Sequence, residues 1–227
     1  MRKFNLEIAC FNFQSAVNAQ LGGADRIELC ENQHLGGTTP SIELLQQVRK
    51  EISIDFRVMI RNRGGNFLYT DEEFEIMKQD IIRFKKLGVN GFVFGMLDAK
   101  NEIDVERNKI LVQQASPLKC TFHKAFDEVD NATESLEKII DCGFDTLLTS
   151  GKKQNALDGS QLISDLIKQS NNRISIMPGG GVRSENILDL KIKTQPNYFH
   201  SSALRSGSEI SDLEEIKRVK KLISSDE

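Results

Sequence analysis

The sequence predicts an α/β protein with the architecture of a (β/α)8 barrel, formed as a single domain by all 227 residues. Eight short apolar segments alternate with longer segments of helical periodicity along the whole chain. No Pro- or Ser-rich linker interrupts this alternation, which requires parallel strands. A closed barrel (TIM barrel) is the simplest arrangement of eight such units. An open doubly wound sheet is the alternative, because the sequence does not show the order of the strands.

The eight expected strands are short apolar runs bounded by polar residues or glycines. In chain order they span Phe4–Cys10, Arg26–Cys30, Phe56–Arg61, Gly91–Gly95, Lys119–His123, Thr146–Thr149, Arg173–Met177 and Tyr198–Ser201. Each is followed by a segment with helical character, so every strand and its following helix form one unit of the expected barrel.

The expected helices begin at capping residues and end at glycines. The first runs from Gln14 to the pair Gly22-Gly23, because glycine commonly follows the last turn of a helix. The third, Asp71–Leu87, follows a capping box and carries one apolar stripe at steps of three and four residues. The expected capping residues of four helices are Ser41, Thr70, Asp104 and Ser184.

The composition excludes several classes of function. The 30 basic and 33 acidic residues give a net charge of −3, which argues against a nucleic-acid partner. No run of 18 apolar residues exists, so no membrane span is expected. The first residues contain no apolar signal-peptide core, which predicts a cytoplasmic protein. In that compartment the four cysteines are expected to be free thiols, and their spacing contains no C-x-x-C motif.

Alternation along the strands predicts a polar barrel interior. The inward-facing set comprises Glu7, Ala9, Glu28, Cys30, Arg57, Met59, Arg61, Thr121, His123, Ser175, Met177, Tyr198, His200 and Ser202. Burial of charged groups is costly unless they pair, so one interpretation is a structural ion network. The other is a polar ligand site, because barrels place active sites at the carboxyl ends of their strands. Under this interpretation the candidate catalytic residues are Glu7, Glu28, Arg61 and His123.

Glycine-rich loops at the same end of the barrel suggest anion binding. The loop after the seventh strand contains Gly179, Gly180 and Gly181 and precedes an expected helix start, whose free N–H groups suit an anion. A simple tight turn is the alternative. Residues expected to complete the ligand site are Arg63, Arg183, His200, Ser201 and Ser202. Arg63 lies in the loop 61–67 and has a side chain suited to carboxylate or phosphate.

Seven segments of the chain together resemble the CutC family. They are GADRIELC (23–30), GGTTPS (36–41), IRNRGGNFLYTDEEFEIM (60–77), TFHKAFD (121–127), LLTSG (147–151), MPGGGVR (177–183) and FHSSA (199–203). Asn62, Asn66 and Lys124 depart from the residues usual in the family, and Lys124 falls on the outward phase of its strand. The resemblance implies a (β/α)8 barrel and a cytosolic role in copper homeostasis, with copper binding.

Two hypotheses of function follow. The first is Cu(I) binding by Cys10 and Cys30, since Cu(I) prefers sulfur ligands. Alternation directs Cys30 inward but Cys10 toward the helices, so a shared ion requires a break in the strand at Ala9–Cys10. The second is an enzyme acting on a small anionic or phosphorylated metabolite at the barrel mouth. The expected partners are therefore a copper ion or a small anion, and a homo-oligomer is the default expectation.

Overall fold

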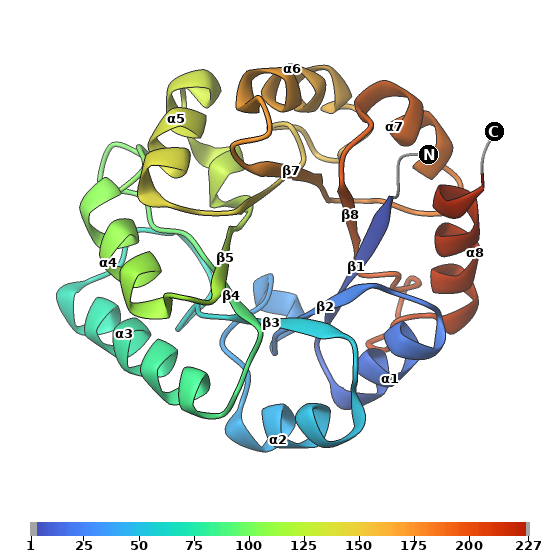
Figure 1. Ribbon diagram of the computed structural model, residues 1–227, viewed down its shortest axis with the longest axis horizontal. Helices are drawn as coiled ribbons and strands as arrows, with labels where there is room; N and C mark the ends of the chain where they lie inside the picture. The colour runs from blue at the N-terminus through green and yellow to red at the C-terminus, as the bar shows by residue number, and fades with distance from the viewer. Residues whose placement is uncertain (1–3, 226–227) are drawn as a thin grey trace.

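The computed structural model describes residues 4–225 and confirms the barrel (Figure 1). Eight parallel strands form one sheet in the order β7-β6-β5-β4-β3-β2-β1-β8. They are β1 (Asn5–Cys10), β2 (Arg26–Leu29), β3 (Asp55–Met59), β4 (Gly91–Phe94), β5 (Lys119–Phe122), β6 (Thr146–Thr149), β7 (Ser175–Pro178) and β8 (Tyr198–Ser201). A parallel bridge between Gly179 and His200 joins the ends of β7 and β8 and nearly closes the barrel.

Eight α-helices form a ring around the strands (Figure 1). They are α1 (Phe13–Leu21), α2 (Ile42–Glu51), α3 (Asp71–Lys86), α4 (Val105–Ala115), α5 (Ala132–Cys142), α6 (Ser160–Ser170), α7 (Ile187–Thr194) and α8 (Leu213–Ser224). Two short 3-10 helices, η1 (Gln33–Leu35) and η2 (Lys124–Glu128), follow β2 and β5. No helix in residues 4–225 is long and apolar enough to cross a membrane.

Most expected helix starts are confirmed by their caps. Thr70 and Glu73 form the reciprocal capping box of α3, and Ser41 and Asp104 cap α2 and α4. The first helix starts one residue earlier than expected, because the side chain of Asn12 caps it by accepting the Ser15 N–H. The expectation for Ser184 is wrong, since α7 begins three residues later, at Ile187.

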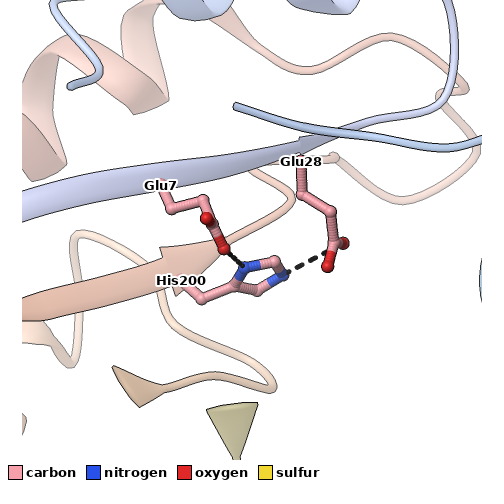
Figure 2. Close-up of side chains that lie close together, drawn as sticks. All are labelled: Glu7, Glu28 and His200. Atoms are coloured by element: carbon pink, nitrogen blue, oxygen red, sulfur yellow. Dashed lines mark hydrogen bonds and ion pairs between the residues drawn. The ribbon is translucent and has the colours of Figure 1, made fainter. Parts of the chain in front are cut away.

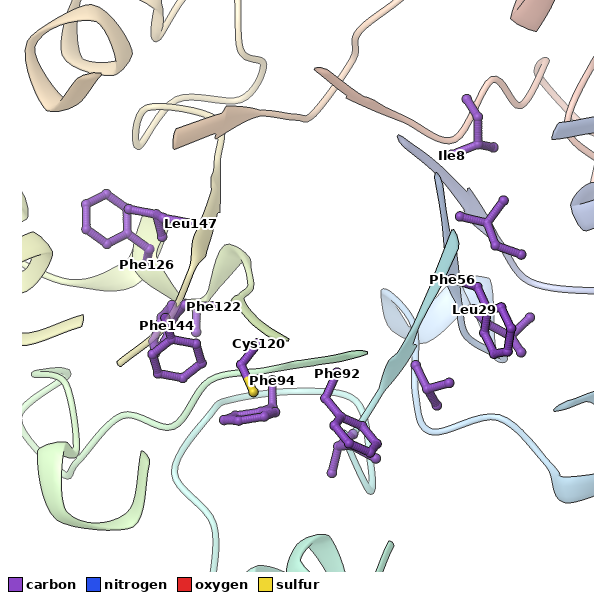
Figure 3. Packing of buried hydrophobic residues seen from close by; sticks show 14 of the residues in the cluster. Ile8, Leu29, Phe56, Phe92, Phe94, Cys120, Phe122, Phe126, Phe144 and Leu147 are labelled. Atoms are coloured by element: carbon purple, nitrogen blue, oxygen red, sulfur yellow. The ribbon is translucent and has the colours of Figure 1, made fainter. Parts of the chain in front are cut away.

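The apolar core lies between the strands and the helix ring. Ile8, Leu29, Phe56, Phe92 and Phe122 belong to one buried cluster that also contains residues of the surrounding helices. Figure 3 shows these five side chains on their strands. Each of these side chains belongs to the outward phase of its strand, so the other phase is left to fill the barrel interior. That arrangement confirms the alternation of side chains along the strands, which predicts a polar barrel interior.

Candidate functional site

A cavity of about 220 Å³ opens at the carboxyl ends of the strands. Residues from both ends of the chain line it, as expected for a site built from the loops of a closed barrel. The lining residues are Ala9, Phe11, Glu28, Gly36, Met59, Arg61, Phe67, His123, Lys124, Leu148, Gly180, Gly181, Arg183, His200, Ser201 and Ser202. The structure therefore brings together most of the ligand and catalytic residues expected from the sequence.

His200 lies between two buried carboxylates on the floor of the cavity (Figure 2). Its Nδ1 is 2.8 Å from Oε1 of Glu7, and its Nε2 is 3.9 Å from Oε2 of Glu28. The other oxygen of Glu7 is paired with the guanidinium of Arg26. Burial opposes ionisation of Glu7, but Arg26 and the His200 hydrogen bond lower its pKa to about 2. Glu7 is thus an ionised carboxylate whose two oxygens are both paired within the protein. It has a structural role and faces His200 rather than the cavity.

Glu28 differs from Glu7 because it remains open to a ligand. Its side chain is buried and lines the cavity, yet its Oε1 has no hydrogen-bond partner among the described residues. Burial raises the pKa of Glu28, and the nearby charge of His200 opposes that rise. A carboxylate with a raised pKa and a free oxygen in a cavity is suited to accept and return a proton.

His123 follows β5 and is held by its own backbone. Its Nδ1 accepts the Ala125 N–H at 3.3 Å, and its ring lies 4.8 Å from the ring of Phe67. Burial and the positive charge of Arg61 lower the pKa of His123 to about 3. Its Nε2 is buried without a partner in residues 4–225. His123 is therefore neutral, and the nitrogen that carries its proton is Nε2.

Arg61 organises the loops that overhang the cavity. Its Nη1 donates to the carbonyl oxygens of Leu35 and Gly37, and its Nη2 donates to that of Gly65. The guanidinium also lies 4.9 Å from the ring centre of Phe67. Arg61 consequently places a fixed positive charge beside His123 while most of its hydrogen-bonding capacity is used by the protein.

The glycine loop after β7 forms the opposite wall. Gly180 has a φ of +102°, and a Cβ at this residue would lie 3.2 Å from Nζ of Lys124. The backbone N–H groups of Gly180 and Gly181 donate to no acceptor within the described chain. Two amide donors without a protein acceptor therefore lie near the Lys124 ammonium group, which also forms an ion pair with Asp127 at 3.7 Å. Amide donors and an ammonium group of this kind are suited to an anion.

Arg183 joins this loop to the segment after β8. Its guanidinium donates to the carbonyl oxygens of Val182 and Leu204 and to the hydroxyls of Ser201 and Ser202. The Ser201 hydroxyl also donates to Val182 O, so it has little capacity left for a ligand. Arg183 and Ser201 hold the wall in place, whereas Ser202 keeps its hydroxyl proton available.

The expected role of the helix start at Ser184 is wrong for a physical reason. Both the backbone N–H and the hydroxyl of Ser184 bond to the carboxylate of Glu215, which comes from α8. A protein carboxylate thus occupies the donors that were expected to receive an anion. The donors left for an anion at this wall are therefore the glycine amides and not the segment before α7.

Five expected site residues do not line the cavity: Glu7, which pairs with Arg26 and His200, and four others. Arg63 pairs with Glu73 on the capping box of α3, and Gly179 lies behind the wall, in the bridge to His200. Cys10 ends the unbroken strand β1 and packs in the cluster between strands and helices. Cys30 packs inside the barrel with Met59 and Val93. Burial raises the pKa of both thiols well above its ordinary value.

A second polar layer lies deeper in the barrel and confirms the structural-network interpretation for that level. Arg57 pairs with Asp145 at 2.7 Å and donates to the hydroxyls of Thr121 and Thr146. These partners engage both terminal nitrogens of its guanidinium. The deeper Arg57–Asp145 ion pair is therefore closed within the protein, whereas Glu28 and His123 at the mouth have atoms without a partner in residues 4–225.

Five lining residues were expected from the sequence neither as site residues nor as inward-facing residues, namely Phe11, Gly36, Phe67, Lys124 and Leu148. Two of them, Lys124 and Phe67, bear on the chemistry of the site. Lys124 was assigned to the outward phase, but β5 ends at Phe122 and the 3-10 turn of η2 redirects the side chain. Phe67 lies in the loop 61–67, which the sequence marked as unusual without indicating which side chain enters the cavity. The TFHKAFD segment, with a basic residue after the strand-end histidine, was the available signal for Lys124.

Glu7, Glu28 and His200 are also close enough to one another to hold a metal ion. Their ligand atoms lie within 4.8 Å of one another. The charge of Glu7 is already neutralised by Arg26, however, and His200 already interacts electrostatically with both carboxylates. The donors are oxygen and nitrogen, which suit divalent cations better than Cu(I).

Residues 4–205 match the sequence profile of the CutC family. The chain belongs to the CutC family. A human copper homeostasis protein cutC homolog is 46% identical over 200 residues, covering 88% of this chain and 73% of the human one. A CutC family protein of Parabacteroides distasonis is 44% identical over 87% of this chain and 82% of its own, and its name states no function. The structure of a copper homeostasis protein CutC from Streptococcus agalactiae superposes with a TM-score of 0.84 at 33% identity, covering 88% and 99% of the two chains.

Proposed function

We propose that this CutC-family protein is an enzyme that acts on a small anionic metabolite at the barrel mouth. The observation that carries the proposal is the open carboxylate of Glu28 in a cavity whose other wall is formed by Lys124 and free glycine amides. A buried polar atom without a partner is costly in a structural site and is expected where a ligand completes it.

The wall at Gly180 and Gly181 supports an anionic group of the ligand. Backbone amides and one lysine can bind a carboxylate or a phosphate, because both carry several acceptor oxygens. The cavity volume of about 220 Å³ limits the enclosed part of the ligand to a small metabolite. The anionic end then faces Lys124, and the reacting end faces Glu28 and His123 on the floor.

Glu28 supplies the chemistry in this proposal. The pKa of Glu28 is raised and so lies closer to neutral pH than that of an ordinary carboxyl group. Transfer of a proton to and from a ligand is most effective when the pKa of the base is near the working pH. His200 and Glu7 hold the floor in position, since Glu7 is closed by Arg26. Turnover of the metabolite would therefore depend on Glu28, and anchoring of the anion on Lys124.

The binding half of the proposal is tested by titrating inorganic phosphate into the ¹⁵N-labelled protein. The amide signals of Gly180 and Gly181 should shift, and Lys124→Met should weaken the apparent affinity by about tenfold, the loss of one charge-assisted contact. Lys153→Met is the matched control, because Lys153 is an exposed lysine of the β6–α6 loop that does not line the cavity. Shifts elsewhere only, or equal effects of both variants, would overturn the proposed anion site.

The second candidate function is Cu(I) binding by Cys10 and Cys30, with a role in copper homeostasis. The names of the human and Streptococcus agalactiae relatives favour it. The sulfur atoms of the two cysteines belong to separate buried clusters on opposite sides of the sheet. As folded, this pair does not fit one shared Cu(I) ion, so the candidate rests on the family and not on the geometry.

A Cu(I) competition titration decides this candidate. Copper binding by the pair predicts that Cys10→Ser/Cys30→Ser lowers the affinity, whereas Cys120→Ser/Cys142→Ser leaves it unchanged because those thiols lie in other parts of the core. Equal affinity of both double variants and the wild type would exclude the pair. We also propose a cytoplasmic location and a homo-oligomeric state, which cell fractionation and light scattering test directly.

A further inference from the structure

The unusual group in the cavity is His123, which is neutral and fixed in one tautomer. Its Nδ1 is occupied by the Ala125 N–H, so the ring proton resides on Nε2. Nε2 is buried, has no protein partner in the described chain, and belongs to a residue that lines the cavity. His123 therefore offers the cavity a neutral hydrogen-bond donor that the protein itself does not use.

The surroundings of His123 keep that donor in place. Phe67 packs against the ring at 4.8 Å, and Phe122 lies on another side at 6.1 Å. Arg61 holds the loop carrying Phe67 and places its positive charge near the imidazole, which disfavours a second proton. The ring can therefore donate one hydrogen bond but does not act as a cationic acid at neutral pH.

Glu28 and His123 together form a base and an electrophile in one cavity. A carboxylate base and a neutral imidazole donor that line the same cavity can together remove a proton from carbon next to a carbonyl group. The donor stabilises the negative charge that develops on the carbonyl oxygen, and its fixed geometry avoids reorganisation during the reaction. A phosphate or carboxylate at the glycine wall would hold such a substrate across the cavity.

We propose that the substrate is a small phosphorylated or carboxylated carbonyl compound, from which Glu28 removes a proton on the carbon next to the carbonyl. This inference rests on the proposed function and specifies its substrate class. The C–H bond breaks and the proton moves to Glu28, while the electron pair of that bond forms a C=C bond. The carbonyl π electrons move to oxygen, and the enolate oxygen accepts the hydrogen bond from Nε2 of His123. Return of the proton to the same carbon completes an exchange. Where that carbon carries a hydroxyl group, transfer of the hydroxyl proton to the enolate oxygen and protonation of the former carbonyl carbon complete an isomerisation, with no external oxidant or co-reactant.

The step can be tested without knowing the physiological product, because proton removal in D₂O exchanges hydrogen for deuterium. The assay uses dihydroxyacetone phosphate and a panel of other short-chain phosphorylated hydroxyketones and hydroxyaldehydes, with C–H signals followed by NMR. The wild type should incorporate deuterium into at least one of them. Glu28→Gln should slow exchange by about 10²- to 10⁴-fold, the usual contribution of a general base. Identical purification of this variant controls for contaminating isomerases.

Two variants of His123 separate its donor from its packing. His123→Leu removes the donor and should slow exchange by about 10²- to 10³-fold, whereas His123→Gln keeps a neutral N–H near the position of Nε2 and should recover much of the rate. A ¹⁵N spectrum of the wild type, independent of any substrate, should show His123 neutral with its proton on Nε2 across about pH 5 to 8.

The outcomes distinguish this inference from the proposed function. Phosphate binding at Gly180 without deuterium exchange in any carbonyl compound would overturn the substrate class and leave the anion site standing. A proton on Nδ1 of His123, or a cationic ring at neutral pH, would also overturn it. If phosphate does not bind to the wild type, the anion site itself is refuted, and with it both the proposed function and this inference.

Discussion

Replacing Glu7 by Gln removes the central anion of the buried floor without changing the size of the side chain. Glu7 is fully buried and bonded to Arg26 and His200, which are themselves buried. The substitution leaves the guanidinium of Arg26 without its counter-charge inside the barrel. An unpaired buried charge is among the strongest single destabilising changes, because water cannot solvate it. We expect Glu7→Gln to fold with a much lower free energy of unfolding.

The size of the effect follows from the pKa of Glu7. Moving this pKa from its ordinary value of 4.5 to about 2 corresponds, at about 1.4 kcal/mol per pH unit, to about 3 kcal/mol. Breaking a buried ion pair costs about 3–5 kcal/mol in other proteins, which agrees. Because the folded pKa is depressed, this stabilisation is fully present above about pH 4.5 and is lost as the pH falls toward about 2.

The assay is urea unfolding of wild type and variant at pH 7 and pH 3. The difference in unfolding free energy should be about 3 kcal/mol at pH 7 and roughly half of that at pH 3. Glu137→Gln is the matched control, because the pKa of Glu137 is also lowered to about 2, by hydrogen bonds from Arg173 and Gln169, but at the exposed surface. That variant should unfold almost as the wild type does. Equal effects of the two substitutions, or a difference that does not shrink at pH 3, would show that the buried charge of Glu7 does not supply this stability.

Three further predictions concern the thiols, a loop and a helix cap. Burial raises the pKa of Cys142 to about 11, so its alkylation at pH 8 in the native protein should be roughly 100-fold slower than that of a free thiol, and unfolding in urea should abolish the difference. Gly151→Ala should lower the melting temperature by several degrees in calorimetry, because Gly151 has a φ of +68° and a Cβ would lie 2.3 Å from the carbonyl oxygen of Gly159. An unchanged melting temperature would show that the loop can adjust. Thr70→Ala should cost about 1 kcal/mol in urea unfolding through loss of the capping box of α3, and a neutral result would contradict that role.

Local patterns in the sequence predicted the eight strand–helix units and the parity of the strands, whereas the order of the strands in a closed barrel comes from the structure. Alternating side chains placed Glu7, Glu28 and His200 in the interior, and the Thr70 capping box predicted the start of α3. These features depend on residues that are close in sequence, so periodicity and capping rules detect them. The family resemblance added the same fold and agrees with the profile match over residues 4–205.

Long-range partners decided which candidate groups are open, and the sequence could not predict them. Glu7 and Glu28 occupy equivalent inward positions, yet only Glu7 is closed by Arg26 on the neighbouring strand. Ser184 loses its expected role because Glu215, 31 residues away on α8, takes its donors. Lys124 enters the cavity because a 3-10 turn follows β5, and strand alternation no longer applies beyond Phe122.

The most direct test of an enzymatic site at the barrel mouth is turnover of an anionic metabolite by the purified protein. Wild type and Glu28→Gln are incubated with a mixture of phosphorylated and carboxylated metabolites, and consumption is followed by mass spectrometry. We expect the wild type to consume an anionic compound and Glu28→Gln to do so at least about 100-fold more slowly. Absence of any consumption by the wild type, or equal rates for the two proteins, would contradict the proposed enzymatic function.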